Sequence, residues 1–219
     1  MNKLKTIGSK LRTYVFIDAS NLFYGGEKSL GWKIDYLKLL NYLTKRYSAK
    51  KLYYFGGIEI YDYPYDYQKQ DSVPVEDVEK YIRRYICKNE QKFDDAKLLL
   101  LSRHLARIKF FRKLQEFGYY LRLKPVKLYY QHDGTTQRKA NCDVDMAFYL
   151  MREIKNYDRI LVLSGDGDFL PVLKYLRKIG KEIIILSRGS RTAREIRQFA
   201  GNKFMDFNYL REMIKISIE

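Results

Sequence analysis

Residues 13–21 read Thr-Tyr-Val-Phe-Ile-Asp-Ala-Ser-Asn, and this stretch predicts the fold. An apolar run from Tyr14 to Ile17 ends in the carboxylate of Asp18, and the polar pair Ser20-Asn21 follows. Buried parallel strands have this pattern, because both of their faces are covered and polar side chains appear only where the strand ends. We therefore expect a first strand at 13–19 that brings functional groups to the carboxyl edge of a parallel sheet.

Strand-like and helix-like segments alternate along the rest of the chain. Apolar residues at helical spacing predict helices at 34–47, 76–117, 143–154, 169–179 and 192–200. Apolar or aromatic runs predict strands at 51–60, 119–130, 159–164 and 181–187, with a loop at 61–75 and a short edge strand and helix after Phe204. The alternation indicates βαβ units, and so an α/β three-layer fold with a mostly parallel central sheet flanked by helices.

Length and composition favour one domain over residues 1–219. The chain is 46% hydrophobic, which suffices for one well-buried core, and it contains no internal repeat, low-complexity segment or linker. Its basic start leads straight into the first strand, so we expect no secretory signal. No apolar run approaches the ~18 residues that span a bilayer, so we expect no membrane association and a cytoplasmic location.

The charge balance favours a polyanionic partner. Lys and Arg number 42 against 26 acidic residues, which gives a formal net charge of +16. Such a surplus suits nucleic acid, because each phosphate contact releases counterions. The alternative is a basic surface that serves solubility alone. Cys87 and Cys142 show no paired metal-ligand spacing, which excludes a zinc site and is typical of reduced thiols.

Acidic residues follow several of the predicted strands. Asp18 ends the first strand, Asp166 and Asp168 lie in the turn after the strand at 159–164, and Asp143 begins a helix. Ligands of parallel sheets bind at the carboxyl ends of the strands. Carboxylates that converge there repel one another unless cations compensate, and Mg²⁺ or Mn²⁺ are the natural partners of oxygen ligands. Such ions can activate water for phosphodiester cleavage.

Helical geometry separates Asp143 from Asp145. Asp143 shares a helix face with Met146 and Leu150, which should pack on the sheet, whereas Asp145 is turned about 200° away and is expected to face solvent. A plainer alternative is that Asp143 and Asp168 only cap helices. Asp18 is harder to explain in this way, since a carboxylate directly after a buried strand is costly to bury without a partner.

Three motifs resemble those of the NYN domain family, including its LabA-like group, within the PIN-like nuclease superfamily. Residues 16–22 (FIDASNL) are similar to the family's opening FIDxxNL motif, and residues 139–144 (KANCDV) to its K-x-x-x-D-V element. Residues 163–171 (LSGDGDFLP), followed by Gly180-Lys181, match its SGDxDFxP…GK pattern. The motifs occur in the family's order and cover most of residues 13–210.

This resemblance implies a PIN-like, Rossmannoid fold and a metal-dependent ribonuclease, with an endonuclease favoured. It implies metal ligands at Asp18, Asp143, Asp166 and Asp168, with Asn21 and Ser164 supporting the site. The chain departs from the family in two ways. Phe148 and Tyr149 stand where many relatives carry a further acid, and the segment at about 61–118 forms a longer helical and loop elaboration.

Basic residues on the same side of the predicted fold are candidates for RNA binding. Those expected to track a phosphate backbone are Arg188, Arg191, Arg194, Arg197 and Lys139. Arg103, Arg107, Arg112 and Lys113 form a second basic region, and the tyrosines at 61–67 offer rings for stacking on single-stranded RNA. The alternative is a solvated helix face and an ordinary aromatic loop.

Other functions remain open on the sequence alone. The first is a catalytically weak or inactive NYN-fold protein that binds RNA or acts as an adaptor, which the missing acid favours. A haloacid-dehalogenase-like phosphatase is disfavoured, because Ser20 stands where that chemistry needs an aspartate. A dinucleotide-binding protein is disfavoured too, because no G-x-G-x-x-G follows the first strand. The sequence leaves open a homo-oligomer as well as a monomer.

Overall fold

The computed structural model describes residues 11–22, 31–130 and 135–216, except for the side chains of Glu90, Gln137 and Lys139. A six-stranded sheet forms its centre, in the order β3-β2-β1-β6-β7-β8, and each neighbouring pair is parallel. The strands are β1 (Thr13–Asp18), β2 (Ala49–Ile58), β3 (Tyr120–Pro125), β6 (Arg159–Leu163), β7 (Glu182–Ser187) and β8 (Phe204–Asp206). The predicted α/β fold with a parallel sheet is confirmed.

The strand order reverses between β1 and β6. The chain winds outward from β1 to β2 and β3, then returns to β6 on the other side of β1 and continues to β7 and β8. A doubly wound sheet has a crevice at such a switch point, outside the carboxyl ends of the two central strands. Asp18, the last residue of β1, lies at this crevice.

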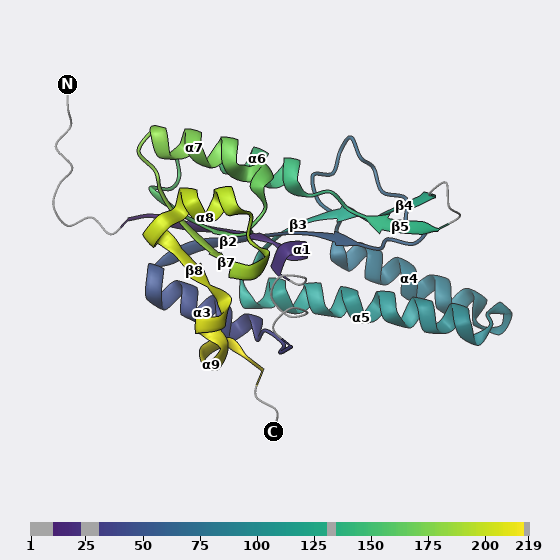
Figure 1. The fold of residues 1–219 in the computed structure, drawn as a ribbon. Coiled ribbons are helices and arrows are strands. Elements are labelled where there is room, and N and C mark those ends of the chain that lie inside the picture. Colours follow the sequence, from purple (N-terminus) through teal and green to yellow (C-terminus); the bar gives the residue numbers. More distant parts are fainter. Residues whose placement is uncertain (1–10, 23–30, 131–134, 217–219) are drawn as a thin grey trace.

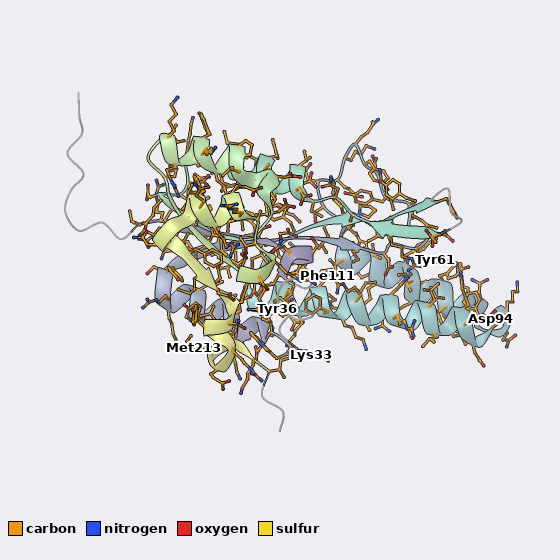
Figure 2. The ribbon with its side chains drawn as sticks, in the orientation of Figure 1. Lys33, Tyr36, Tyr61, Asp94, Phe111 and Met213 are labelled. Atoms are coloured by element: carbon orange, nitrogen blue, oxygen red, sulfur yellow. The ribbon has the colours of Figure 1, made fainter. Side chains whose placement is uncertain are left out.

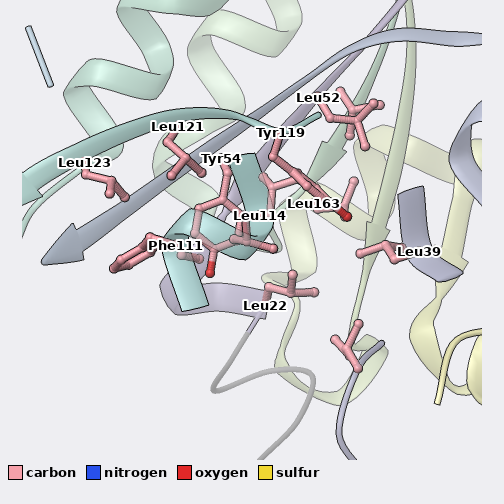
Figure 3. Packing of buried hydrophobic residues seen from close by; sticks show 14 of the residues in the cluster. Leu22, Leu39, Leu52, Tyr54, Phe111, Leu114, Tyr119, Leu121, Leu123 and Leu163 are labelled. Atoms are coloured by element: carbon pink, nitrogen blue, oxygen red, sulfur yellow. The ribbon is translucent and has the colours of Figure 1, made fainter. Parts of the chain in front are cut away.

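Helices cover both faces of the sheet (Figure 1). On one face lie α6 (Asp143–Arg152), α7 (Leu170–Lys178) and α8 (Arg194–Ala200). On the other lie α3 (Tyr36–Tyr47), α4 (Val75–Asn89), α5 (Asp95–Phe117) and α9 (Arg211–Ile214). The β1 side chains alternate between the two cores, since Val15 and Ile17 enter one and Tyr14 and Phe16 the other. Figure 3 shows the first core, where Phe111 and Leu114 of α5 pack near Tyr54 of β2.

The segment predicted as one helix at 76–117 is two helices. α4 and α5 are separated by a short 3-10 turn, η2 (Glu90–Lys92), and Asp94 caps α5 by accepting a hydrogen bond from Lys97 N at 2.7 Å. The two helices form a hairpin, with Asp94 at its outer tip and Phe111 near the sheet (Figure 2). Within the described residues, no helix is long and apolar enough to cross a bilayer.

Glu79 cross-links the two helices of the hairpin. Its carboxylate is largely buried and lies 2.7 Å from Arg83 on its own helix and 2.9 Å from Arg112 on α5. The two guanidinium groups hold the pKa of the Glu79 carboxyl below its ordinary value. The charges of Glu79 and Arg112 are therefore used to join the helices rather than to bind an external partner.

The strand predicted at 119–130 is also divided in two. β3 ends at Pro125, and the chain then leaves the central sheet to form β4 (Lys127–Tyr130), which pairs antiparallel with β5 (Thr136–Lys139). Proline interrupts a ladder because it has no N–H group to donate. β5 was not expected from the sequence, and the turn expected at 132–134 lies outside the described residues.

Phe111→Ala should lower the free energy of unfolding by about 3–5 kcal/mol, since it removes a fully buried ring and leaves a cavity. Urea unfolding followed by circular dichroism would measure this change. Tyr209→Ala is the control, because Tyr209 is 79% exposed and its loss should change stability by no more than about 0.5 kcal/mol. Equal effects of the two substitutions would contradict the described packing of α5 on the sheet.

Candidate functional site

Asp18 is a buried carboxylate surrounded by hydrogen-bond donors. Its Oδ1 accepts from Ser20 N at 3.0 Å, Ser20 Oγ at 2.7 Å and Asn21 N at 3.1 Å, which caps the short helix α1 (Ala19–Asn21). Its Oδ2 accepts from Ser164 Oγ at 3.1 Å. Asp18 is only 6% exposed, and these protein donors replace the hydrogen bonds to water that it loses on burial. They also hold its side chain in one position.

Ser164 and Asn21 tie the ends of β1 and β6 together. Because Ile17 pairs with Leu163 in the sheet, Asp18 and Ser164 are the next residues on neighbouring strands. Ser164 Oγ also accepts from Asp166 N at 3.2 Å, and Asn21 Oδ1 accepts from Gly165 N at 3.1 Å. The structure thus brings four of the expected site residues into one connected network of hydrogen bonds.

Asp166 and Asp168 occupy the turn that follows β6. Asp166 is half-buried, and its Oδ1 accepts from Asp168 N at 3.0 Å, which caps the 3-10 turn η3 (Gly167–Phe169). Asp168 is exposed, and the N-cap of α7 is Phe169, without a side-chain hydrogen bond. The alternative in which Asp168 caps the following helix is therefore wrong.

Asp143 is the first residue of α6. It is half-buried, and its N–H donates to Asn141 Oδ1 at 3.0 Å, while Cys142 occupies the N-cap position. The capping alternative for Asp143 is therefore wrong as well. Met146 and Leu150 pack in the core, as the helical period predicted.

Asp145 differs from the expectation that it faces solvent. It is half-buried, and its Oδ2 lies 2.8 Å from Lys124 Nζ near the end of β3. The helical period could not show this contact, because Lys124 comes from an element distant in the sequence.

A hollow of about 270 Å³ adjoins Asp18. Its wall includes Ser20, Cys142 and Arg107, the last reaching it from α5. The two glycines at the end of β2 leave room for close approach, because a Cβ on Gly57 would lie 2.7 Å from the Cβ of Ala140.

The expected metal ligands have the oxygen donors that Mg²⁺ or Mn²⁺ prefers, but their side chains are not gathered around one point. All of them offer oxygen atoms, and Asp18 forms no ion pair with Lys or Arg in the described part of the chain. Nevertheless, among the described residues no three His, Cys, Asp or Glu side chains lie close enough together to hold a metal ion. The described residues thus include suitable donor groups, but these groups do not form a complete coordination site.

The chain after β7 supplies site residues that the sequence did not indicate. Ala193 N donates to Gly165 O at 2.8 Å, so this segment is fastened to the turn that carries Asp166. A Cβ on Gly167 would collide with the carboxylate of Glu195, which places a further acid beside that turn. The sequence signal for this contact is Gly167 alone. A glycine permits close approach, but it does not show which residue approaches.

The expected RNA-binding arginines divide into two groups. Arg188 lies 3.5 Å from Asp206 with a side chain only 20% exposed, so it serves an internal ion pair. Arg191, Arg194 and Arg197 are exposed. Lys139 is the last residue of β5, but its side chain lies outside what the structure describes.

The second basic region and the 61–67 tyrosines are partly used in packing. Arg112 pairs with Glu79, whereas Arg107 lines the hollow beside Asp18. Tyr61 donates to Tyr85 Oη at 3.0 Å, but Tyr67 is 62% exposed. Of these aromatic rings, Tyr67 is the one best placed to meet a ligand.

Comparisons with known proteins agree with the motifs and the fold. The NYN domain model matches residues 12–208. Low amplitude and bright protein LabA of Synechococcus elongatus is 26% identical over 208 residues, which cover 93% of this chain and 88% of that protein. The crystal structure of VPA0982 from Vibrio parahaemolyticus, a protein of unknown function, superposes with a TM-score of 0.59 at 16% identity, covering 97% of this chain and 100% of that one.

A weaker structural likeness involves the bacteriophage T5 D15 flap endonuclease, solved in complex with DNA and metal ions. It has a TM-score of 0.41 at 14% identity and covers 86% of this chain and 60% of that one.

Cys142 should resist thiol reagents while Cys87 reacts. Burial, together with the nearby carboxylate of Asp145, raises the pKa of Cys142 to about 12, and Cys87 is exposed. Since the thiolate is the reactive form, Ellman's reagent at pH 8 should titrate one thiol in the native protein and two in denaturant. Cys87→Ser should remove the fast reaction, and its persistence would show that the Asp18 hollow is more open than described.

Proposed function

Because the chain belongs to the NYN domain family, we propose that it is a metal-dependent ribonuclease that hydrolyses phosphodiester bonds at the carboxyl edge of its sheet. The observation that supports this most strongly is the buried carboxylate of Asp18, tied to Ser164 at the switch point of the sheet. Its position at the edge of the sheet where ligands bind supports a role in binding beyond the cap that it provides for α1.

Each candidate residue has a distinct part in this proposal. Asp18, Asp143, Asp166 and Asp168 would hold Mg²⁺ or Mn²⁺. A bound divalent ion supplies an activated water and compensates the charge that develops on the phosphate. Ser164 orients the Asp18 carboxylate and accepts a hydrogen bond from the Asp166 N–H group, and Asn21 holds the turn at Gly165.

Single-stranded RNA is the substrate that the surface favours. The net charge of +16 attracts a polyanion, and the exposed Arg191, Arg194 and Arg197 lie on the segment fastened to the Gly165 turn. We favour an internal cut, as the resemblance to the family implies.

The second candidate function is RNA binding without cleavage, or an adaptor role. Two observations favour it. No three potential ligands among the described residues are gathered around one point. Tyr149, which stands where relatives carry a further acid, is 4% exposed and packs 5.6 Å from Phe55, centroid to centroid.

Asp18→Asn and Asp166→Asn should each reduce RNA cleavage by at least about a hundredfold. The reason is that each removes a charge needed to bind the metal ion. The measurement uses labelled single-stranded and structured RNAs with Mg²⁺, Mn²⁺ or EDTA, and we expect cleavage by wild type only with a divalent metal.

Asp77→Asn is the matched control, because Asp77 is an exposed carboxylate on α4. It should cut at the wild-type rate. RNA binding by wild type without cutting in any metal would reject the nuclease and favour the second candidate. Cleavage that survives both site substitutions would place the active site elsewhere.

Replacing Arg191, Arg194 and Arg197 by Gln should weaken RNA binding and flatten its dependence on salt. Three lost phosphate contacts should reduce the slope of log K against log salt by about 2 for a single strand. Fluorescence anisotropy at several salt concentrations would measure this slope.

The control variant replaces Lys45, Arg46 and Lys50 by Gln. These residues are exposed, lie around the end of α3 and the start of β2, and carry the same total charge. They mark the amino edge of the sheet, so their loss should affect binding only through net charge. Equal slopes for the two triple variants would show that the arginines do not form the track.

A further inference from the structure

A second hollow, of about 460 Å³, opens at the carboxyl end of β3. It lies between the 61–75 loop, β3, β4 and α6, and Ala140 lines both this hollow and the one beside Asp18. We name it the β3 pocket. The two hollows are therefore neighbours along one edge of the sheet. The metal-site proposal does not use the β3 pocket.

Exposed aromatic rings surround the β3 pocket. Tyr67 of the loop is 62% exposed, Phe148 of α6 is 58% exposed and Tyr129 of β4 is 51% exposed. Three separate elements thus contribute rings to one hollow, although exposed rings gain nothing from packing in the core. The arrangement suits a flat, polarisable ligand such as a nucleobase, which stacks on aromatic faces whatever its identity.

The polar wall of the pocket suits the remainder of a nucleotide. Lys124 and Lys127 line it and supply ammonium groups for a phosphate, and Lys127 Nζ also lies 5.7 Å from the ring centroid of Tyr67. Asp145 lines it too, paired with Lys124, and can accept hydrogen bonds from the amino group of a base.

One buried polar atom on this wall, Arg122 Nε, lacks a hydrogen-bond partner among the described residues. Arg122 also lies over the ring of Tyr149, with 4.8 Å between the guanidinium carbon and the centroid. The hydroxyl of Tyr149 interacts with Arg152 instead. Unsatisfied buried groups are rare in folded proteins, and a ligand with an acceptor atom would satisfy the Arg122 N–H group.

We propose that the β3 pocket binds one unpaired nucleotide of an RNA strand whose neighbouring phosphate lies at Asp18. The placement of the neighbouring phosphate at Asp18 rests on the proposed ribonuclease function. Binding of the nucleotide in the pocket does not require cleavage. The volume matches a small organic ligand rather than a protein segment. A base in a duplex is stacked and paired and cannot enter the pocket, so the substrate must be unpaired at this position.

The test is binding of a short single-stranded RNA that carries 2-aminopurine, measured in EDTA so that no cleavage occurs. Stacking of 2-aminopurine between the rings should quench its fluorescence in the wild-type complex. Tyr67→Ala and Phe148→Ala should each weaken binding by about tenfold and abolish much of the quenching. Both side chains are exposed, so neither substitution should lower the unfolding temperature.

Tyr209→Ala is the matched control, because Tyr209 is an exposed ring on η6 (Phe207–Leu210), away from the β3 pocket. It should bind and quench like wild type. The free 2-aminopurine ribonucleotide is a further arm. If it is quenched at micromolar concentration, the pocket serves free nucleotides and the proposed RNA occupant is wrong. If only the oligonucleotide is quenched, the proposal holds.

The outcomes separate this inference from the ribonuclease proposal. Quenching that depends on Tyr67 and Phe148, without metal-dependent cleavage, would reject the nuclease and retain the pocket. Cleavage by wild type, with the two substitutions leaving binding, quenching and cutting unchanged, would retain the nuclease and reject the pocket. Failure of wild type to bind or quench the oligonucleotide would also reject the pocket.

Discussion

The carboxylate of Asp18 is held by four hydrogen bonds at the junction of β1 and β6, and the organisation of the site depends on them. Three donors come from the residues that follow β1, and the fourth is Ser164, directly after the neighbouring strand β6. A buried carboxylate without donors would cost several kcal/mol. The bonds therefore fix the Asp18 side chain at the point where the strand order reverses, and they orient the turn that carries Asp166.

The same edge of the sheet carries three features side by side. The Asp18 network lies at the centre, the exposed arginines lie after β7, and the β3 pocket lies beyond β2. All three occur at the carboxyl ends of parallel strands, where the loops leave the sheet and form the crevice in which ligands bind. Gly57 contributes by its lack of a side chain, because the segment at Ala140 passes close to it and separates the two hollows.

Charge in this protein is divided between internal and external use. Arg112 joins the helical hairpin through Glu79, and Arg188 pairs with Asp206, so these cations are largely neutralised. The count of 42 Lys and Arg residues consequently overstates the number of cations that can meet a phosphate, whereas the net charge of +16 already cancels each such pair. Exposure and pairing, rather than the count of basic residues, separate Arg191 from Arg188 as a candidate for RNA contact.

Hydrophobic period and chain order are local properties, so the amino-acid sequence alone predicts the strands of the parallel sheet, most helices and the carboxylate at the end of β1. Which distant groups meet depends on how the chain folds in three dimensions. Asp145, expected to face solvent, pairs with Lys124 at the β3 pocket. The carboxylate of Glu195 lies against Gly167. The three-dimensional fold also sets where the 119–130 strand divides. Such contacts depend on side chains far apart in the chain, and no local pattern encodes their distance.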